Sequence, residues 1–405
     1  MKNSTSQKRN IELDRLRAAA VLLLIWHHII QFIPVPVNII PSKLTTTWSG
    51  VELFFVISGF IVSSTVVPRM NFALAITPKL ERRSALFAVI RAFFIRRVFR
   101  LLPLVFATVL FYLALNVSSR LLMHHLHIFN SDVFGPIDKV FQEVTSILTL
   151  TYNFNIINGG PHSLGWFWSL SIEEQFYLLF PVFIIVFPAD KMRLFLAIIY
   201  FTVITAVIRP FFTPEGTIDS DYVRYSSHLK FDSIMAGCAI YFISVKCKAM
   251  KIPTILSKPV TASIISGFLI VCLGLVPGFI SSAPLGHFLI NIISIKLVFL
   301  ASLRKNLVLP VRPLEGILNW FGRRSYTLYL VQQPVLSASF VFWFIVIRIF
   351  YFESSFVFSF LTLTFALIFG FLVTELLFYL VEKPMIRLGH KISDHLENKV
   401  LRETQ

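Results

Sequence analysis

Apolar runs of about twenty residues recur along the chain, separated by short polar or charged segments. A run of this length crosses the hydrocarbon layer of a bilayer as an α-helix. The pattern predicts ten such spans, at about residues 18–33, 48–67, 98–116, 167–187, 192–208, 228–245, 260–280, 285–303, 325–347 and 355–381. We therefore expect an all-α integral membrane protein with about ten transmembrane helices.

The positions of Lys and Arg predict how these helices are oriented. Cytoplasmic loops of membrane proteins are enriched in both residues. Ten alternating helices place 29 of the 37 Lys and Arg residues on one side, in segments 1–17, 68–100, 188–193, 246–258, 304–324 and 383–405. Both termini are therefore expected in the cytoplasm, and the net charge of +16 follows from topology rather than from nucleic-acid binding.

The same pattern predicts the domain organisation. Residues 1–390 are expected to form a single transmembrane domain and residues 391–405 a short cytoplasmic tail, with no appended soluble domain. The basic cytoplasmic loop 68–100 is expected to hold an interfacial amphipathic helix, and loop 117–166 is expected on the opposite side. The polar N-terminus is followed by no small-residue cleavage site, so the first apolar run is expected to remain as an anchor.

Composition agrees with this class of protein. Hydrophobic residues make up 56% of the chain and charged residues 14%, with a mean hydropathy of +0.75. Soluble domains keep about 25% charged residues. The three cysteines, Cys238, Cys247 and Cys272, lack the spacing of metal ligands, so no metal site is expected.

The first span, within LDRLRAAAVLLLIWHH, has ionisable residues at both ends. Arg17 and His28 are eleven residues apart, so they share one helix face at a separation of roughly 16 Å along the axis. Ionisable groups within spans usually face a bundle interior or a water-filled cavity. The alternative is that Arg17 is a topology anchor and His28 an interfacial histidine.

The second span opens with WSGVELFFVISGF. Glu52 lies at the depth of His28, where a carboxylate would orient an imidazole that acts as a general base. The alternative is a water-facing carboxylate at a helix start. Ser58 and Gly59 are small residues that allow another helix to approach closely.

Two further segments carry candidate binding residues. Arg97 and Arg100 precede the third span on one helix face, and guanidinium groups bind phosphates as readily as they mark topology. In GWFWSLSIEEQFYLLFP, Trp168 is suited to stacking on a sugar and Glu173 to binding its hydroxyls. A helix start with an aromatic belt is the alternative.

Six segments together resemble the acyltransferase 3 family of integral-membrane acyltransferases. They occur in the family's order between about residues 9 and 387: RNIELDRLRAAAVLLLIWHH, GVELFFVISGF, RRVFRLLP, WSLSIEEQFYLLFP, FGRRSYTLYLVQQPV and FYLVEKP. The resemblance implies a ten-helix core that O-acylates, usually O-acetylates, cell-envelope carbohydrates, with an acyl-coenzyme A as donor.

The family's motifs fall on particular residues of this chain. Its arginine and histidine pair corresponds to Arg17 and His28, and its acidic residue before two phenylalanines to Glu52. Its basic pair falls on Arg97 and Arg100, and its glutamate on Glu173. Many members carry a histidine where this chain has Gln332, so Gln332 is expected to donate hydrogen bonds in the cavity, with Tyr326 nearby.

The expected reaction places the donor on the cytoplasmic side of a cell inner membrane. Acetyl-coenzyme A or another acyl-coenzyme A serves as co-substrate, with its phosphates held by Arg97, Arg100 and Arg17. His28, oriented by Glu52, either deprotonates a sugar hydroxyl or first takes the acyl group itself. O-antigen, exopolysaccharide and lipo-oligosaccharide all remain candidate acceptors, and the acyl chain length and oligomeric state stay open.

Two alternatives to an acyltransferase of envelope carbohydrates stay open, one of another functional class and one with another acceptor. The charged intramembrane residues would also suit a transporter or exporter of envelope intermediates. The absence of inverted repeats and of paired broken helices in the sequence disfavours that alternative. A membrane acyltransferase that acts on lipid or protein is the second alternative.

Overall fold

The computed structural model describes residues 9–32, 46–126, 134–135, 137–212, 221–247, 254, 258–280, 284–350 and 355–403. Every regular element in these ranges is a helix, as expected from the sequence. The first half contains α1 (Ile11–Phe32), α2 (Gly50–Leu74), α3 (Lys79–His125), α4 (Ile137–Leu148), α5 (Tyr152–Ile157), η2 (Gly165–Phe167), α6 (Trp168–Val186), α7 (Asp190–Val203), η3 (Ile204–Ile208) and α8 (Arg209–Phe212). The second half contains α9 (Asp221–Tyr225), α10 (Ser227–Cys247), α12 (Pro259–Ile280), α13 (Pro284–Ser302), η4 (Arg312–Leu314), α14 (Glu315–Phe350), α15 (Ser355–Leu377), η5 (Phe378–Glu382) and α16 (Lys383–Glu403).

Each of the ten predicted spans coincides with a helix in the described ranges. Seven helical segments are long and apolar enough to cross a membrane. The helix α13 is apolar but shorter, whereas polar side chains lower the hydropathy of α1 and α10. The chain is thus a multi-pass membrane protein. The span count of ten and the cytoplasmic position of both termini stay predictions.

The helix α3 corrects the predicted loop 68–100. It is continuous from Lys79 to His125, 47 residues, which at 1.5 Å per residue is about 70 Å. Residues 68–74 thus belong to the end of α2, and residues 79–100 form a helix that continues into the third span, so the segment is helical rather than a loop. No helix-breaking residue interrupts α3 before Pro103, so the helix propagates through both segments.

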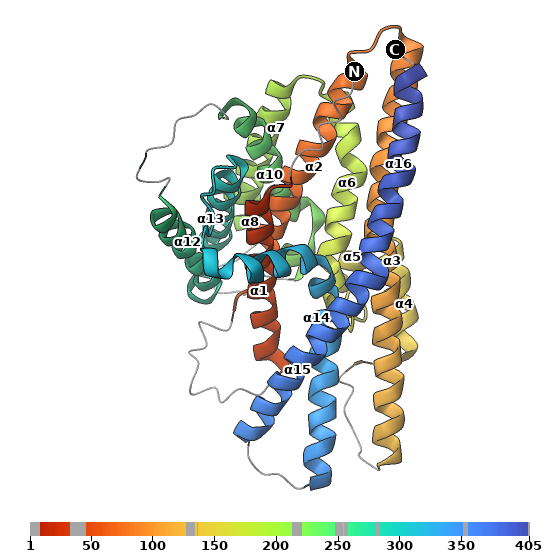
Figure 1. Ribbon diagram of the computed structural model, residues 1–405, viewed down its shortest axis with the longest axis vertical. Coiled ribbons are helices and arrows are strands. Elements are labelled where there is room, and N and C mark those ends of the chain that lie inside the picture. Colours follow the sequence, from red (N-terminus) through yellow and green to blue (C-terminus); the bar gives the residue numbers. More distant parts are fainter. Residues whose placement is uncertain are drawn as a thin grey trace.

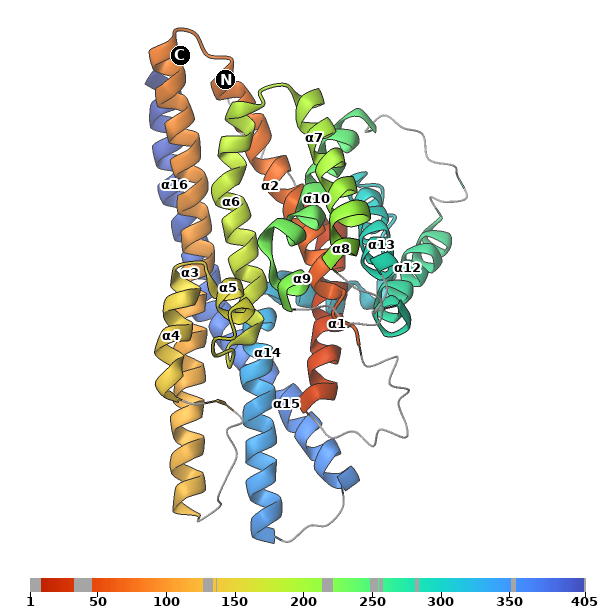
Figure 2. The same ribbon diagram turned by 180° about the vertical axis from the view of Figure 1, so that it is seen from behind.

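The predicted tail 391–405 also differs from the structure. The helix α16 passes residue 390 without a break and packs along α3. Arg96 on α3 donates a hydrogen bond to Ser393 (3.1 Å) and lies 3.5 Å from a carboxylate oxygen of Asp394. Both views of the molecule show α3 and α16 side by side along one edge, with α12 and α13 at the other (Figure 1, Figure 2).

The segment 117–166 is largely folded rather than an open loop. It contains the last turns of α3, then α4, α5 and η2. The buried carboxylate of Glu143 holds it together by accepting hydrogen bonds from the Tyr152 hydroxyl (2.6 Å) and the backbone N–H of Leu164 (2.7 Å). Burial and the neighbouring Glu143 raise the pKa of Tyr152, which keeps this phenol protonated and able to donate.

Helix α2 packs against α1, α3, α6, α10 and α13. Its closest approach is to α10, where Gly59 of α2 faces Gly237 of α10. This confirms the expectation that Gly59 admits a neighbouring helix. A Cβ atom on Gly237 would lie 2.1 Å from the carbonyl oxygen of Val56, which is backbone and cannot swing away.

We expect Gly237→Ala to destabilise the protein by about 1–3 kcal/mol, because the added methyl group forces α2 and α10 apart. Thermal unfolding in detergent would measure the change. Gly267→Ala on α12 is the matched control, since no atom lies within 4 Å of its added Cβ. The control should be neutral or slightly stabilising, because Ala favours the helix over Gly. Equal stability of the two variants would contradict the prediction.

Candidate active site

Three cavities follow one another through the bundle. A basic cavity of about 620 Å³ lies between the starts of α1, α14 and α16. A narrow passage of about 80 Å³ shares Arg17, Arg100 and Tyr326 with it. The passage in turn shares Val51 and Tyr329 with a large cavity of about 1010 Å³. The three cavities therefore form a series from one side of the bundle to the other.

Cationic side chains dominate the basic cavity. Two carboxylates, Asp14 and Glu382, are among its described lining residues. Asp14 pairs with Arg9 (2.5 Å) and approaches Arg17 (3.4 Å), and Glu382 accepts a hydrogen bond from Thr327. The cations that line the cavity are Arg9, Arg17, Arg100, Arg304, Arg323, Arg324, Lys383 and Arg387. This excess of guanidinium groups is suited to a ligand with several phosphates.

The narrow passage contains three of the predicted arginines. Arg17 comes from α1, and Arg97 and Arg100 come from α3. The guanidinium of Arg97 lies 4.0 Å from the ring centroid of Tyr177, a cation–π contact that fixes its position. Tyr326 also lines the passage and donates a hydrogen bond to the carbonyl of Leu101 (3.2 Å).

Glu173 lies in this passage rather than in the expected acceptor region. It accepts a hydrogen bond from Ser58 (2.8 Å) and shares the passage with the arginines. Trp168 lines the large cavity instead. The two residues are five positions apart on α6, which separates them by about 140° around the helix, so they lie on different faces of it.

The large cavity has an aromatic wall. The ring of Trp168 makes edge contacts with Tyr225 (5.1 Å between centroids) and Phe55 (6.0 Å). Trp48 packs against His287 (5.0 Å) on another part of the lining. Flat aromatic faces beside polar groups suit the two apolar faces and the hydroxyl rim of a sugar ring.

His28 lines the large cavity, and its Nδ1 atom is buried without a hydrogen-bond partner. The adjacent His27 instead contacts Gln31 through its Nε2 atom (3.1 Å). Arg17 and His28 lie on the single helix α1 and line successive cavities, so α1 connects the basic end of the series with the large cavity. Of the two histidines, His28 has the free nitrogen that a base or nucleophile requires.

Glu52 does not orient His28. Its two carboxylate oxygens are taken by α10: Oε1 pairs with the Lys230 ammonium and Oε2 accepts a hydrogen bond from Ser233 (2.6 Å). Glu52 and Lys230 have side-chain exposures of 1% and 2%. A buried carboxylate is stabilised most by a nearby cation, and α10 supplies that cation, so the expected carboxylate–imidazole pair does not form.

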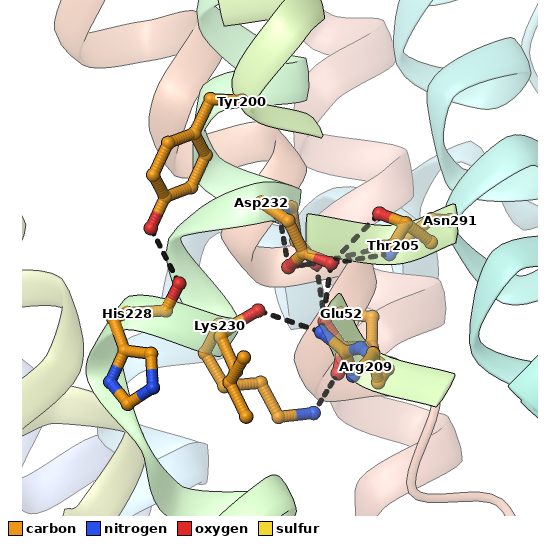
Figure 3. Close-up of polar contacts among 10 residues, drawn as sticks. Glu52, Tyr200, Thr205, Arg209, His228, Lys230, Asp232 and Asn291 are labelled. Carbon is orange, nitrogen blue, oxygen red and sulfur yellow. Dashed lines mark hydrogen bonds and ion pairs between the residues drawn. The ribbon is translucent and has the colours of Figure 1, made fainter. Parts of the chain in front are cut away.

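The Glu52–Lys230 pair belongs to a larger buried network (Figure 3). The Ser233 hydroxyl oxygen also lies 2.8 Å from the Oδ1 atom of Asn291, and the amide nitrogen of Asn291 donates to the neighbouring Asp232 (3.4 Å). Arg209 is fully buried and pairs with Asp232 (2.8 Å), which also accepts a hydrogen bond from Thr205 (3.1 Å). Two carboxylates and two cations thus compensate one another at the inner wall of the large cavity, which Glu52 and Lys230 line.

Gln332 lies beside the His28 side chain but is not among the described lining residues of the large cavity. It lines an apolar groove between α1, α14 and α15, and its amide nitrogen donates to the carbonyl of Tyr329 (3.3 Å). Its Oε1 atom is buried without a hydrogen-bond partner. The residue that lines the large cavity at this point of α14 is the next one, Gln333, because adjacent residues are about 100° apart around a helix.

Sequence reasoning missed the residues on α10. Lys230 and Asp232 were visible as charges inside an otherwise apolar span, the usual sign of a functional or structural polar site in a membrane. Their partners on α2, α8 and α13 could not be read from the sequence. Within the described ranges no group of three His, Cys, Asp or Glu side chains could hold a metal ion. Cys238, Cys247 and Cys272 are free.

These features define an all-helical membrane protein with a polar cavity series that crosses its core. The acyltransferase 3 family, described as an acyltransferase domain, matches residues 10–379. The chain therefore belongs to that family.

Proteins with similar sequences are named as O-acetyltransferases. The chain is 26% identical to peptidoglycan O-acetyltransferase OatA of Listeria monocytogenes over 362 residues, which cover 83% of this chain and 51% of OatA. It is 25% identical to the putative peptidoglycan O-acetyltransferase YrhL of Bacillus subtilis, covering 96% of this chain and 57% of YrhL. A putative O-acetyltransferase of Staphylococcus aureus, SACOL0978, is 27% identical over 80% of this chain and 50% of its own length. The chain thus spans about half the length of these relatives. No solved structure matches it.

Proposed function

We propose that this protein is an O-acyltransferase of the cytoplasmic membrane that transfers an acetyl or other short acyl group from acyl-coenzyme A to a hydroxyl of a cell-envelope carbohydrate. The observation that carries the proposal is the series of cavities, with a strongly basic chamber at one end and His28 in an aromatic chamber at the other. The names of the relatives, two of them for peptidoglycan, support an envelope polymer as acceptor.

The donor fits the basic end of this series. Coenzyme A carries a diphosphate and a 3′-phosphate at one end and a slender pantetheine arm at the other. Arg17 and Arg100 line both the basic cavity and the narrow passage, so they would hold the phosphates while the arm enters the passage with Arg97 along its side. Because coenzyme A is a cytoplasmic metabolite, this arrangement supports the predicted cytoplasmic position of the basic cavity.

The acceptor fits the large cavity, where Trp168 offers a stacking surface and His28 a free nitrogen. His28 removes the proton of a sugar hydroxyl, and the alkoxide oxygen attacks the thioester carbonyl carbon. The tetrahedral intermediate collapses by breaking the carbon–sulfur bond, and the imidazolium returns the proton to the departing thiolate. The products are the O-acyl sugar and free coenzyme A.

A second possible sequence of steps passes through an acyl-histidine intermediate on His28. His28 attacks the thioester first, coenzyme A leaves as the thiol, and the sugar hydroxyl then takes the acyl group from the imidazole. Release of thiol before any acceptor is added would identify this order. In both orders Glu52 supports the cavity wall through Lys230 and takes no part in proton transfer.

The direct test measures free thiol from acetyl-coenzyme A in membranes that contain the protein, with and without an envelope glycan. Acceptor-dependent thiol release, together with a base-labile acetyl group on the glycan, is the expected result. A transporter of envelope intermediates would release no thiol, and that outcome would contradict the proposal.

Arg100→Ala should raise the KM for acetyl-coenzyme A by about 10-fold to 100-fold, the effect of losing a charge-assisted hydrogen bond to phosphate. The KM for the glycan should not change, because Arg100 does not line the large cavity. Steady-state kinetics with each substrate varied in turn would measure both values. Arg83→Ala is the matched control, since Arg83 is an exposed arginine of the same helix outside these cavities. An unchanged donor KM in Arg100→Ala would remove this residue from the donor site.

A further inference from the structure

Positively charged side chains outnumber negatively charged ones in the described lining of the large cavity. Lys139, Arg224 and Lys230 line it, whereas Glu52 is the one carboxylate among its described lining residues. The remaining ionisable lining groups, apart from tyrosine, are histidines, which carry either no charge or a positive charge. The cavity therefore has an excess of positive charge at neutral pH.

The one carboxylate in the described lining, that of Glu52, already has a cationic partner. Glu52 pairs with Lys230, and both side chains are almost completely buried. That pair is neutral as a unit, so the excess charge belongs to Lys139 and Arg224. Neither has an ion pair with a carboxylate in the part of the chain that the structure describes.

The two cations lie in the outer part of the cavity. Lys139 is exposed on α4 and Arg224 is half-buried on α9, whereas Lys230 is buried at the inner wall. The guanidinium of Arg224 lies 6.0 Å from the ring centroid of Tyr225, which also lines the cavity. Two short helices that are remote in sequence thus each bring a cation to the same chamber.

Two cations that line one cavity without a carboxylate partner give it a positive potential, which attracts an anionic ligand. A negatively charged group in the cavity would gain charge-assisted hydrogen bonds from them, which Arg makes in bidentate fashion to carboxylate or phosphate. A neutral sugar would leave both cations without a counter-charge.

We propose that the acceptor is an anionic saccharide, whose carboxylate or phosphate is held by Lys139 and Arg224 while a hydroxyl is presented to His28. This inference rests on the proposed acyl transfer and specifies its acceptor. It predicts that acceptor charge acts through KM, because the two cations bind a group that does not react.

The test uses the full chain in detergent or nanodiscs with acetyl-coenzyme A and three oligosaccharides of equal length: one neutral, one with uronic acids and one phosphorylated. We expect kcat/KM for at least one anionic acceptor to exceed that for the neutral one by about tenfold or more. The double variant Lys139→Ala, Arg224→Ala should lose this preference through a higher acceptor KM, with kcat and the KM for acetyl-coenzyme A unchanged. The charge-conserving variant Lys139→Arg, Arg224→Lys should keep most of it. The preferred oligosaccharide identifies the anion as carboxylate or phosphate.

Binding alone provides a second measurement, because Trp48, Trp166 and Trp168 line the cavity and report occupancy by fluorescence. Tighter binding of the anionic oligosaccharides to the wild-type protein than to the double variant supports the inference, even where no thiol is released. Equal kcat/KM for neutral and anionic acceptors would overturn the anionic acceptor and leave the acyltransferase function intact. Absence of thiol release with every acceptor would instead count against the proposed function.

Discussion

His28→Ala should reduce acyl transfer from acetyl-coenzyme A by about 10²-fold to 10⁴-fold, the contribution of a positioned general acid–base. The reason is geometric. Both adjacent histidines line the chamber that follows the donor passage, and of the two only His28 has a buried ring nitrogen without a hydrogen-bond partner in the described part of the chain. An alanine at this position removes both the base and the nucleophile, so neither order of events survives.

The matched control is His27→Ala. His27 contacts Gln31, so its loss should change the rate by less than tenfold and leave the thermal unfolding of the protein similar to that of His28→Ala. Thiol release and unfolding temperature should be measured on the same preparations, which separates lost chemistry from lost folding. Activity of His28→Ala close to wild type would remove His28 from the mechanism.

Lys230→Met should destabilise the protein by about 3–5 kcal/mol, because it leaves the Glu52 carboxylate buried without its cation. Ser233 would remain as a hydrogen-bond donor to one carboxylate oxygen, which does not compensate a buried charge. Chemical unfolding in detergent, followed by tryptophan fluorescence, measures the loss. Lys296→Met is a suitable control, since Lys296 is an exposed lysine within the apolar helix α13.

A double-mutant cycle makes this prediction sharper. Adding Glu52→Gln to Lys230→Met removes the uncompensated charge, so the double variant should be more stable than Lys230→Met alone. Additive losses in the two single variants would show that Glu52 and Lys230 do not interact in the folded protein. That result would contradict the ion pair on which the correction of Glu52's role depends.

Several parts of the fold followed from local properties of the chain. A segment within lipid must satisfy its backbone hydrogen bonds internally, so each apolar run of sufficient length forms a helix. The placement of Arg17 and His28 on one helix also follows from a spacing of eleven residues. Gly59 was identifiable as a site of close helix approach because it lacks a side chain.

Other parts depend on contacts that sequence spacing cannot predict. Glu52 and Lys230 are 178 positions apart, and the partner of a buried carboxylate depends on which helix packs beside it. For the same reason the sequence could not predict that Glu173 lines the passage with the arginines, or that Gln332 lines the groove between α1, α14 and α15. The packing of α16 along α3 likewise joins segments that are far apart in the sequence.

The sequence by itself determined the helical membrane class, the position of the predicted spans and the candidate residues His28, Arg17, Arg97 and Arg100, because helix periodicity and the cost of charge in lipid act locally along the chain. The tertiary structure alone decided which of these residues share a cavity, which carboxylate meets which cation, and that Lys139 and Arg224 line the same cavity as His28. Those outcomes depend on packing between helices far apart in the sequence, and packing is a property of the whole bundle.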